Sequence, residues 1–161
     1  SNPPLPFQEL IGHDAVGECI VVDQEPVSLS QRSNPATYLR IFDELRRLFA
    51  ASPDAKARGF GPSHFSFNHA DGQCPRCEGD GVLSIDMHFL ADVSTVCTEC
   101  KGTRYRAEVL QAKYRDRSIS DVLHLSCDEA YDFFRGEEKL RSRLRGLIDL
   151  GLGYLHLGQP A

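Results

Sequence analysis

The sequence has no long hydrophobic run and none of the common catalytic signatures. No apolar stretch approaches the roughly 20 residues of a transmembrane helix, so we expect no membrane partner and a cytoplasmic location. The chain opens SNPPLPFQEL, without the features of a secretory signal, which argues against disulfides. It contains no G-x-S-x-G, H-E-x-x-H or G-x-x-x-x-G-K-[ST] motif. We therefore predict no catalytic residues, and no ATPase activity for these residues alone.

The bulk composition indicates a globular chain without an overall basic character. Of 161 residues, 41% are hydrophobic and 25% are charged, and the formal net charge is −5. This length suits one domain, or a core with a small metal-held module. Basic residues nevertheless gather in Lys101–Arg117 and again in Lys139–Arg145. Each run is either a solvated face or a surface for phosphate groups.

Four of the six cysteines form two C-x-x-C pairs. The first pair is Cys74 and Cys77, the second is Cys97 and Cys100, and nineteen residues separate the pairs. Two intervening residues let one tight turn direct both thiolates toward a single tetrahedral ion. A glycine follows each pair at the same offset, as in CEG and CKG, where a turn around a metal needs positive φ. We predict a closed, structural Zn²⁺ site with all four cysteines as ligands.

The alternatives for these cysteines fit less well. A redox C-x-x-C is one pair beside a βαβ pattern, and an iron–sulfur cluster does not require two symmetric pairs. The two remaining cysteines, Cys19 and Cys127, have no partner at ligand spacing and are expected to be buried thiols.

Periodicity and capping signals predict an α+β fold, with a helical body supporting a zinc-stabilised β-ribbon module. A buried strand is expected at Gly17–Gln24 and a helix at Ser33–Ala51, capped by Asn34. Residues 82–90 and 92–96 are expected to form a hairpin, and Arg104–Ser118 a basic β-ribbon. The S-x-x-E pattern at Ser126 predicts a further helix. We divide the chain into a strand–helix segment at 1–69, the zinc module at 70–120 and a helical segment at 121–161.

Several motifs in order resemble the UvrA family, the damage-recognising component of the bacterial excinuclease and an ABC-type ATPase of nucleotide excision repair. They are VVDQEPV, RSNPATYLRIFDELRRLFA, FSFN, CPRCEGDGV, MHFLADV, CTECKGTRY and GLGYLHLGQP. The resemblance implies an internal piece of the C-terminal ATPase half. The phosphate-binding loop would then precede residue 1, and the ABC signature would follow residue 161.

The resemblance also implies roles for individual residues and partners. The four cysteines match the zinc module of the family, and Gln24 falls where its Q-loop glutamine contacts nucleotide and Mg²⁺. By analogy, five basic residues are expected to contact DNA: Arg104, Arg106, Lys113, Arg115 and Arg117. ATP and Mg²⁺ would bind only the full-length protein. The implied partners are damaged double-stranded DNA, the rest of the ATPase with its dimer mate, and UvrB, the second component of the excinuclease.

Other interpretations remain open from the residues alone. After Gln24 the family pattern S-P-I-G-R-T-P-R is replaced by EPVSLSQR, which suggests a paralogous member. The motif CPRCEGDG also fits the C-x-x-C-x-G-x-G repeat of DnaJ-type co-chaperones, although those use four repeats. A third possibility is a structural insertion that braces the ATPase without touching DNA.

Overall fold

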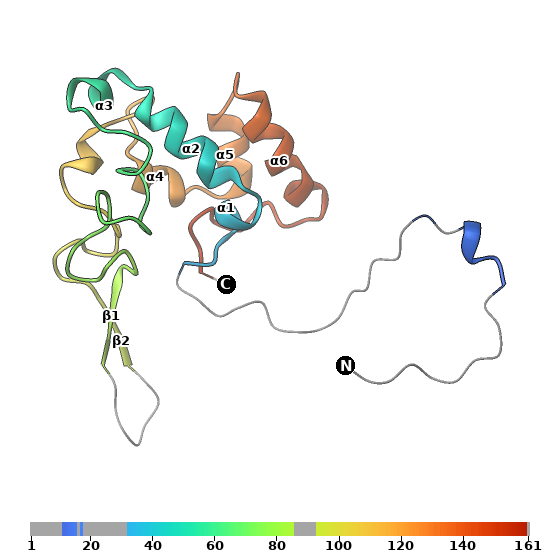
Figure 1. The fold of residues 1–161 in the computed structure, drawn as a ribbon, viewed down its shortest axis with the longest axis horizontal. Coiled ribbons are helices and arrows are strands. Elements are labelled where there is room, and N and C mark those ends of the chain that lie inside the picture. The colour runs from blue at the N-terminus through green and yellow to red at the C-terminus, as the bar shows by residue number, and fades with distance from the viewer. Residues whose placement is uncertain (1–10, 16, 18–31, 86–92, 161) are drawn as a thin grey trace.

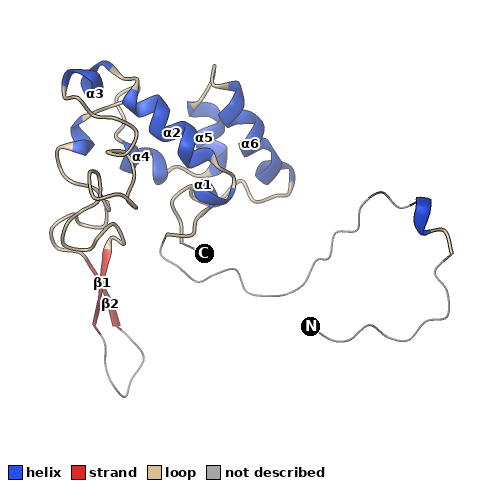
Figure 2. Cartoon of the chain, in the orientation of Figure 1, coloured by secondary structure: helices blue, strands red, loops and turns tan. Residues whose placement is uncertain are grey.

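A computed structural model describes residues 11–15, 17, 32–85 and 93–160 of the chain. A group of short helices forms a body from which a β-hairpin projects at one end (Figures 1 and 2). This arrangement confirms the predicted α+β class. The helices are η1 (His13–Ala15), α1 (Pro35–Tyr38), α2 (Ile41–Ala50), α3 (Pro53–Ala57), η2 (Val109–Gln111), α4 (Ile119–Leu123), α5 (Cys127–Phe133) and α6 (Glu138–Asp149). Within the described ranges, no helix has both the length and the apolar character needed to cross a membrane.

The helix predicted at Ser33–Ala51 begins as expected but is broken in the middle. The Asn34 side chain accepts a hydrogen bond from the Thr37 N–H at 3.0 Å, with Pro35 in the first turn. The chain then turns at Arg40, whose φ of 53° is left-handed, so α1 and α2 are separate helices. Arg143 of α6 donates to the carbonyl groups of Leu39 and Arg40. The break between α1 and α2 is therefore in contact with a residue 103 positions further along the chain.

Side-chain caps also fix the starts of α3, α4 and α5. Ser52 caps α3, and Pro53 occupies the first turn of that helix. The predicted capping box of Ser126 and Glu129 is present at the start of α5. A second box, between Ser118 and Asp121, starts α4.

The predicted hairpin is confirmed over its described residues, whereas the part predicted within residues 86–92 lies outside them. Strands β1 (Val82–Ile85) and β2 (Val93–Val96) pair antiparallel, with Val82 opposite Val96 and Ile85 opposite Val93. The hydrophobic side chain of Leu83 in β1 packs against the cluster of Cys74, Cys77, Cys97 and Cys100 at the base of the hairpin. The hairpin therefore extends directly from the two loops that carry the cysteine pairs, residues 74–81 and 97–104 (Figure 1).

The prediction of a basic β-ribbon at Arg104–Ser118 is wrong. That segment contains the 3₁₀ turn η2 and two isolated bridges, Gln73 with Tyr105 and Tyr114 with Arg117. Tyr105, Val109 and Ala112 of this segment enter the core of the body, at intervals of four and three residues and not in strict alternation. The strand predicted at Gly17–Gln24, including Cys19 and Gln24, lies outside the described residues except for Gly17.

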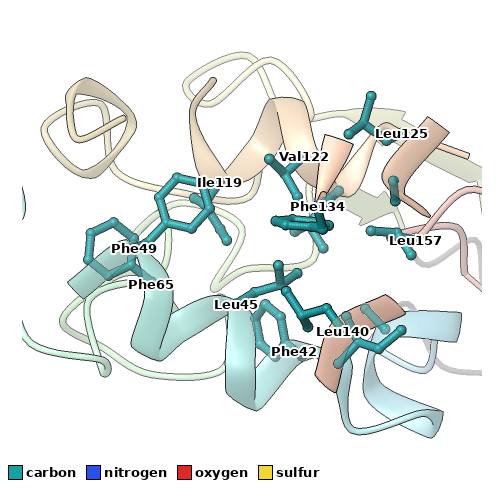
Figure 3. Close-up of a cluster of buried hydrophobic side chains, with 14 of the residues drawn as sticks. Phe42, Leu45, Phe49, Phe65, Ile119, Val122, Leu125, Phe134, Leu140 and Leu157 are labelled. Atoms are coloured by element: carbon teal, nitrogen blue, oxygen red, sulfur yellow. The ribbon is translucent and has the colours of Figure 1, made fainter. Parts of the chain in front are cut away.

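The core of the body joins side chains from distant parts of the chain. Figure 3 shows α2 contributing Phe42, Leu45 and Phe49, facing Phe134 and residues near the C-terminal end. The rings of Phe49 and Phe65 lie 5.5 Å apart. Further members of this cluster include Ile119, Val122, Leu140, Leu144 and Leu157, all buried. Because α6 and the C-terminal segment bury leucines against α2, the body has a continuous apolar centre on which the metal-binding loops rest.

Candidate metal centre

The two cysteine pairs lie on loops that repeat one backbone conformation at an offset of 23 residues. After the second cysteine of each pair, a non-glycine residue takes a left-handed φ, 51° at Glu78 and 52° at Lys101. A left-handed glycine follows in each loop, with φ of 91° at Gly79 and 85° at Gly102. The equal turns direct both sulfur atoms of a pair to the same side, which is the local reason for the C-x-x-C-x-G pattern.

Backbone hydrogen bonds between the loops follow the same symmetry. The N–H of Cys74 donates to the carbonyl of Arg104 at 2.9 Å, and the N–H of Cys97 donates to the carbonyl of Gly81 at 3.0 Å. Each loop thus holds the first cysteine of the other loop. The four thiols are brought together by paired backbone contacts and do not depend on side-chain packing alone.

The sulfur atoms have the spacing that a single tetrahedral ion requires. Cys74 Sγ lies 4.0 Å from Cys97 Sγ, and Cys77 Sγ lies 3.6 Å from Cys100 Sγ. All four sulfurs lie within 4.8 Å of one another. With metal–sulfur bonds of about 2.3 Å, the edge of a tetrahedron is about 3.8 Å. The four side chains are buried, with exposed fractions of 8% or less, so the group could hold one metal ion without room for a water ligand.

Burial and backbone N–H groups act in opposite directions on the thiols. Burial raises the pKa of Cys77 to about 12, against hydrogen bonds from the N–H groups of Gly81 and Gly79. For Cys97, burial also disfavours the thiolate, but hydrogen bonds from the N–H groups of Cys100 and Glu99, together with those from the thiols of Cys100 and Cys77, outweigh it and lower the pKa to about 7. N–H groups directed at sulfur stabilise the ionised form, which is the form that binds a metal.

The first metal-binding loop docks on the body through close backbone contact. A Cβ atom at Gly79 would lie 1.8 Å from the carbonyl oxygen of Phe67. Phe67 is buried, its ring lies 4.7 Å from that of Phe42 in α2, and it meets Tyr105 edge-on at 6.1 Å. The buried Tyr105 hydroxyl donates to the carbonyl of Phe65 at 3.3 Å. This aromatic layer connects the metal centre to the helices.

Arg104 occupies a position that the first loop gives to glycine. In the internal repeat it corresponds to Gly81, and the two residues have φ of 73° and 78°. For a non-glycine residue this left-handed conformation is unfavourable by about 1–2 kcal/mol. The Arg104 guanidinium lies over the Phe67 ring, 5.2 Å from its centroid, which offsets part of that cost.

Comparisons with known proteins agree on one family. No family model matches the chain. The UvrABC system protein A of Aquifex aeolicus is 47% identical over 96% of this chain, and that of Thermus thermophilus is 46% identical over 98%. The crystal structure of UvrA2 from Deinococcus radiodurans matches 87% of the chain with 49% identity and a TM-score of 0.83. Over this region the chain belongs to the UvrA family.

The chain corresponds to only a part of such a protein. It spans about 17% of the length of the UvrA relatives that it matches, and 17% of the UvrA2 chain. The agreement supports the family resemblance over the DnaJ-type alternative, because the matches extend over the helical body as well as the cysteine loops.

The structure separates the five basic residues expected from the UvrA resemblance to contact DNA. Arg104 and Arg106 adjoin the second metal-binding loop, where Arg106 is exposed and donates to the Ala70 carbonyl at 3.1 Å. The exposed Lys113 contacts Asp54 of α3 through its backbone N–H, at 3.4 Å. Arg117 lies over the ring of Phe133 in α5. The five therefore belong to different contact regions and do not line a single ribbon.

Arg115 caps the C-terminal end of α5. Its Nη1 donates to the Phe133 carbonyl at 2.6 Å and its Nη2 to the Arg135 carbonyl at 2.9 Å. The last carbonyl groups of a helix lack intrahelical partners and carry partial negative charge, so a guanidinium is well suited to them. Sequence reasoning missed this contact because no local signal connects residue 115 with residues 133 and 135.

We expect Arg115→Ala to destabilise the folded chain by about 1–2 kcal/mol, because two charge-assisted hydrogen bonds are lost. The free energy of unfolding by urea would measure the effect. Arg135→Ala is the matched control. Arg135 is an exposed arginine of the same region whose 3.3 Å pair with Asp132 is worth about 0.5 kcal/mol. Unchanged stability with weakened DNA binding would instead make Arg115 a DNA contact.

Proposed function

We propose that this segment is a zinc-held module that contacts duplex DNA in a UvrA-type protein of nucleotide excision repair. The observation that carries the proposal is the buried four-sulfur group, set in a chain that shares 44–49% identity with UvrABC system protein A over nearly its whole length. The metal would have a structural role, because four protein ligands leave no open position.

Zinc is the ion that best fits this donor set. Four thiolates in a tetrahedral arrangement favour Zn²⁺ or an iron–sulfur site, and the sulfur spacing of 3.6 to 4.8 Å suits one ion. The repeated loops supply two thiolates each, as in known structural zinc sites. Deprotonation would be completed by the ion itself, which favours thiolate over thiol.

Exposed basic side chains near the metal centre support a DNA contact. Lys101 and Arg106 are both exposed and line one depression together with the buried Cys74 and Cys100 and the exposed Glu99 and Glu108. A metal centre of this kind fixes the backbone of the loop that carries Lys101 and Arg106. Their Cα positions are therefore held rigidly. We propose Arg106, with Lys113 and Arg117, as phosphate contacts, whereas Arg104 and Arg115 have their main contacts inside the protein.

DNA binding by the metal-loaded chain should be weak, independent of sequence and strongly dependent on salt. We expect Arg106→Ala to lower the affinity and to reduce the slope of log K against log salt by about 0.9, the loss of one phosphate contact. Fluorescence anisotropy of a labelled duplex at four salt concentrations would measure both quantities.

The control is Arg58→Ala, which removes the same charge from an exposed position at the end of α3. Equal effects of the two variants would indicate a dependence on net charge alone. If the wild-type chain binds no duplex even at low salt, the segment has a bracing role in the ATPase and the DNA contact is rejected.

In the complete protein we propose that this module works within an ATP-dependent DNA-repair machine of the bacterial cytoplasm. ATP and Mg²⁺ would bind outside this segment, except for a contact from Gln24. The partners would be the remainder of the ATPase, its dimer mate and the second excinuclease component, UvrB. The basis for these proposals is the family membership.

A further inference from the structure

An apolar groove of about 530 Å³ lies between α1, the end of α6 and the C-terminal segment. Its hydrophobic lining comes from Tyr38 and Leu39 at the end of α1, Leu147 of α6, and Leu152 and Leu155 beyond that helix. Within the described part of the chain, no charged residue lines it, although 25% of the sequence is charged. Such depletion of charge is typical of the centre of a protein–protein interface.

The hydrophobic side chains of the groove are only partly covered by the body itself. Leu39, Leu147 and Leu155 pack against the core on one side and are partly buried. Tyr38 is 56% exposed. Covering these side chains would remove apolar surface from water, which is favourable in proportion to the area covered. The groove is therefore a surface that an apolar partner would stabilise.

The two polar residues of the groove make their hydrogen bonds within the body. Asn34 Oδ1 accepts from the Thr37 N–H at 3.0 Å, and Asn34 Nδ2 donates to the Arg32 carbonyl at 3.3 Å. Gln159 Oε1 accepts from the His156 N–H at 3.4 Å. A site for a small polar ligand has several polar groups that converge on the ligand, and a site for nucleic acid has cations. The lining of this groove instead favours an apolar protein surface.

The two ends of the body meet at this groove. Pro35 lies where the chain enters the body and Pro160 where it leaves, and both line the groove. The N–H of Ala36 donates to the carbonyl of Leu157 at 3.0 Å, and Figure 1 shows the two segments side by side. Ends that emerge together are typical of a domain inserted within another. Because the chain spans about 17% of the length of its UvrA relatives, most of a full-length protein connects to the body through this edge.

We propose that this groove is the surface by which the body docks on the remainder of its own protein, with an apolar segment of the ATPase seated between α1 and the end of α6. Two connections that leave one edge keep the remainder close to that edge. This proximity raises its effective concentration at the groove and lowers the entropic cost of docking, an advantage that a second copy of the chain lacks. The inference rests on the proposed partnership with the rest of the ATPase, and it is independent of the DNA contact.

Hydrogen exchange of the full-length protein, measured without DNA, would test the proposal. We expect Tyr38→Glu to accelerate exchange at the backbone amides of residues 36–40 and 152–158 at least about tenfold, because a carboxylate in the groove opposes an apolar cover. The matched control is Tyr154→Glu, the same change at a tyrosine that is 68% exposed and does not line the groove. This control, and Tyr38→Phe, which keeps the ring, should exchange like the wild type.

The same variants in the metal-loaded chain alone separate loss of docking from damage to the body. Tyr38 is exposed there, so Tyr38→Glu should leave both the exchange rates and the urea midpoint unchanged. Equal acceleration in the chain alone and in the full-length protein would overturn the proposal, as would equal effects of Tyr38→Glu and Tyr154→Glu. Sedimentation equilibrium tests the other occupant: a dimer of the chain that Tyr38→Glu dissociates would assign the groove to a second copy and overturn the proposal.

Failure of this inference is distinguishable from failure of the proposed function. If the full-length protein protects other faces of the body but not the groove, relative to the chain alone, the ATPase contact lies elsewhere and only the groove is rejected. If it protects no face, the partnership with the ATPase is rejected too. The DNA contact is measured separately on Arg106→Ala and Arg58→Ala, whose side chains do not line the groove.

Discussion

Removal of the metal from the four-cysteine centre is expected to unfold the region between residues 72 and 106 while most of the helical signal survives. In the hairpin β1–β2, Leu83 is the hydrophobic side chain that packs against the cysteine cluster, and a two-stranded hairpin of this size is too small to be stable alone. Structural zinc contributes an apparent ~10–16 kcal/mol in modules of this size, comparable to the stability of a whole domain. Without the metal, four buried thiols must repel or hydrogen-bond one another. No other element within the described region can replace that stabilisation.

Metal analysis should find one zinc per chain before chelation. Circular dichroism should then show a modest loss of signal after chelation, together with a large gain in the protease sensitivity of the metal-binding loops. Material that is metal-free after exhaustive chelation yet resists protease like the untreated protein would contradict the proposed role of the metal.

Matched cysteine variants separate ligand loss from loss of a buried thiol. Cys77→Ala should lose the metal and reproduce the effect of chelation. Cys127→Ala should retain it and lose about 1 kcal/mol, since Cys127 is fully buried in α5 and far from the cluster in sequence. Burial, with the charge of Asp128, raises the pKa of Cys127 to about 11, so this thiol should react slowly in the folded protein. Equal metal content in the two variants would exclude Cys77 as a ligand.

The features of this fold that can be predicted from sequence are those fixed by neighbouring residues. The C-x-x-C-x-G turns, the Asn34 cap and the Ser126 capping box depend on contacts within a few positions, and they are present in the structure. In each of them the side chain or glycine acts on residues next to it in the sequence, so the spacing of the residues is enough to predict the feature.

The features that sequence reasoning missed depend on distant partners. The break at Arg40 is held by Arg143, and the role of Arg115 depends on carbonyl groups about 20 residues further along the chain. The alternating residues of Arg104–Ser118 mimic a strand because residues enter the core at turns of irregular spacing. An alternation of apolar and polar residues does not by itself distinguish a strand from an irregular segment. The groove beside Tyr38 likewise joins segments near residues 38, 147 and 155.

The two loop glycines should differ sharply in their tolerance of alanine, although their backbone conformations are nearly equal. Gly79 and Gly102 have φ of 91° and 85°, so each alanine carries the same conformational cost of about 1–2 kcal/mol. Around Gly102, the nearest atom to a new Cβ is a Val96 methyl carbon at 3.6 Å, an ordinary contact. Around Gly79, the new Cβ would lie 1.8 Å from the Phe67 carbonyl oxygen. This oxygen belongs to the backbone, so it cannot move out of the way by a side-chain rotation.

We therefore expect Gly79→Ala to destabilise the metal-loaded chain by about 3–5 kcal/mol and Gly102→Ala by about 1–2 kcal/mol. Urea unfolding in excess zinc, followed by circular dichroism, would measure both values. The difference isolates the contact between the first loop and the body, because the metal-binding turn is strained equally in the two variants. Similar losses for both would mean that the turn itself dominates, and that the loop does not depend on Phe67 for its position. A large loss confined to Gly79→Ala would mean that the metal centre is held against the helices by backbone contact, so that any surface it presents is fixed relative to the body.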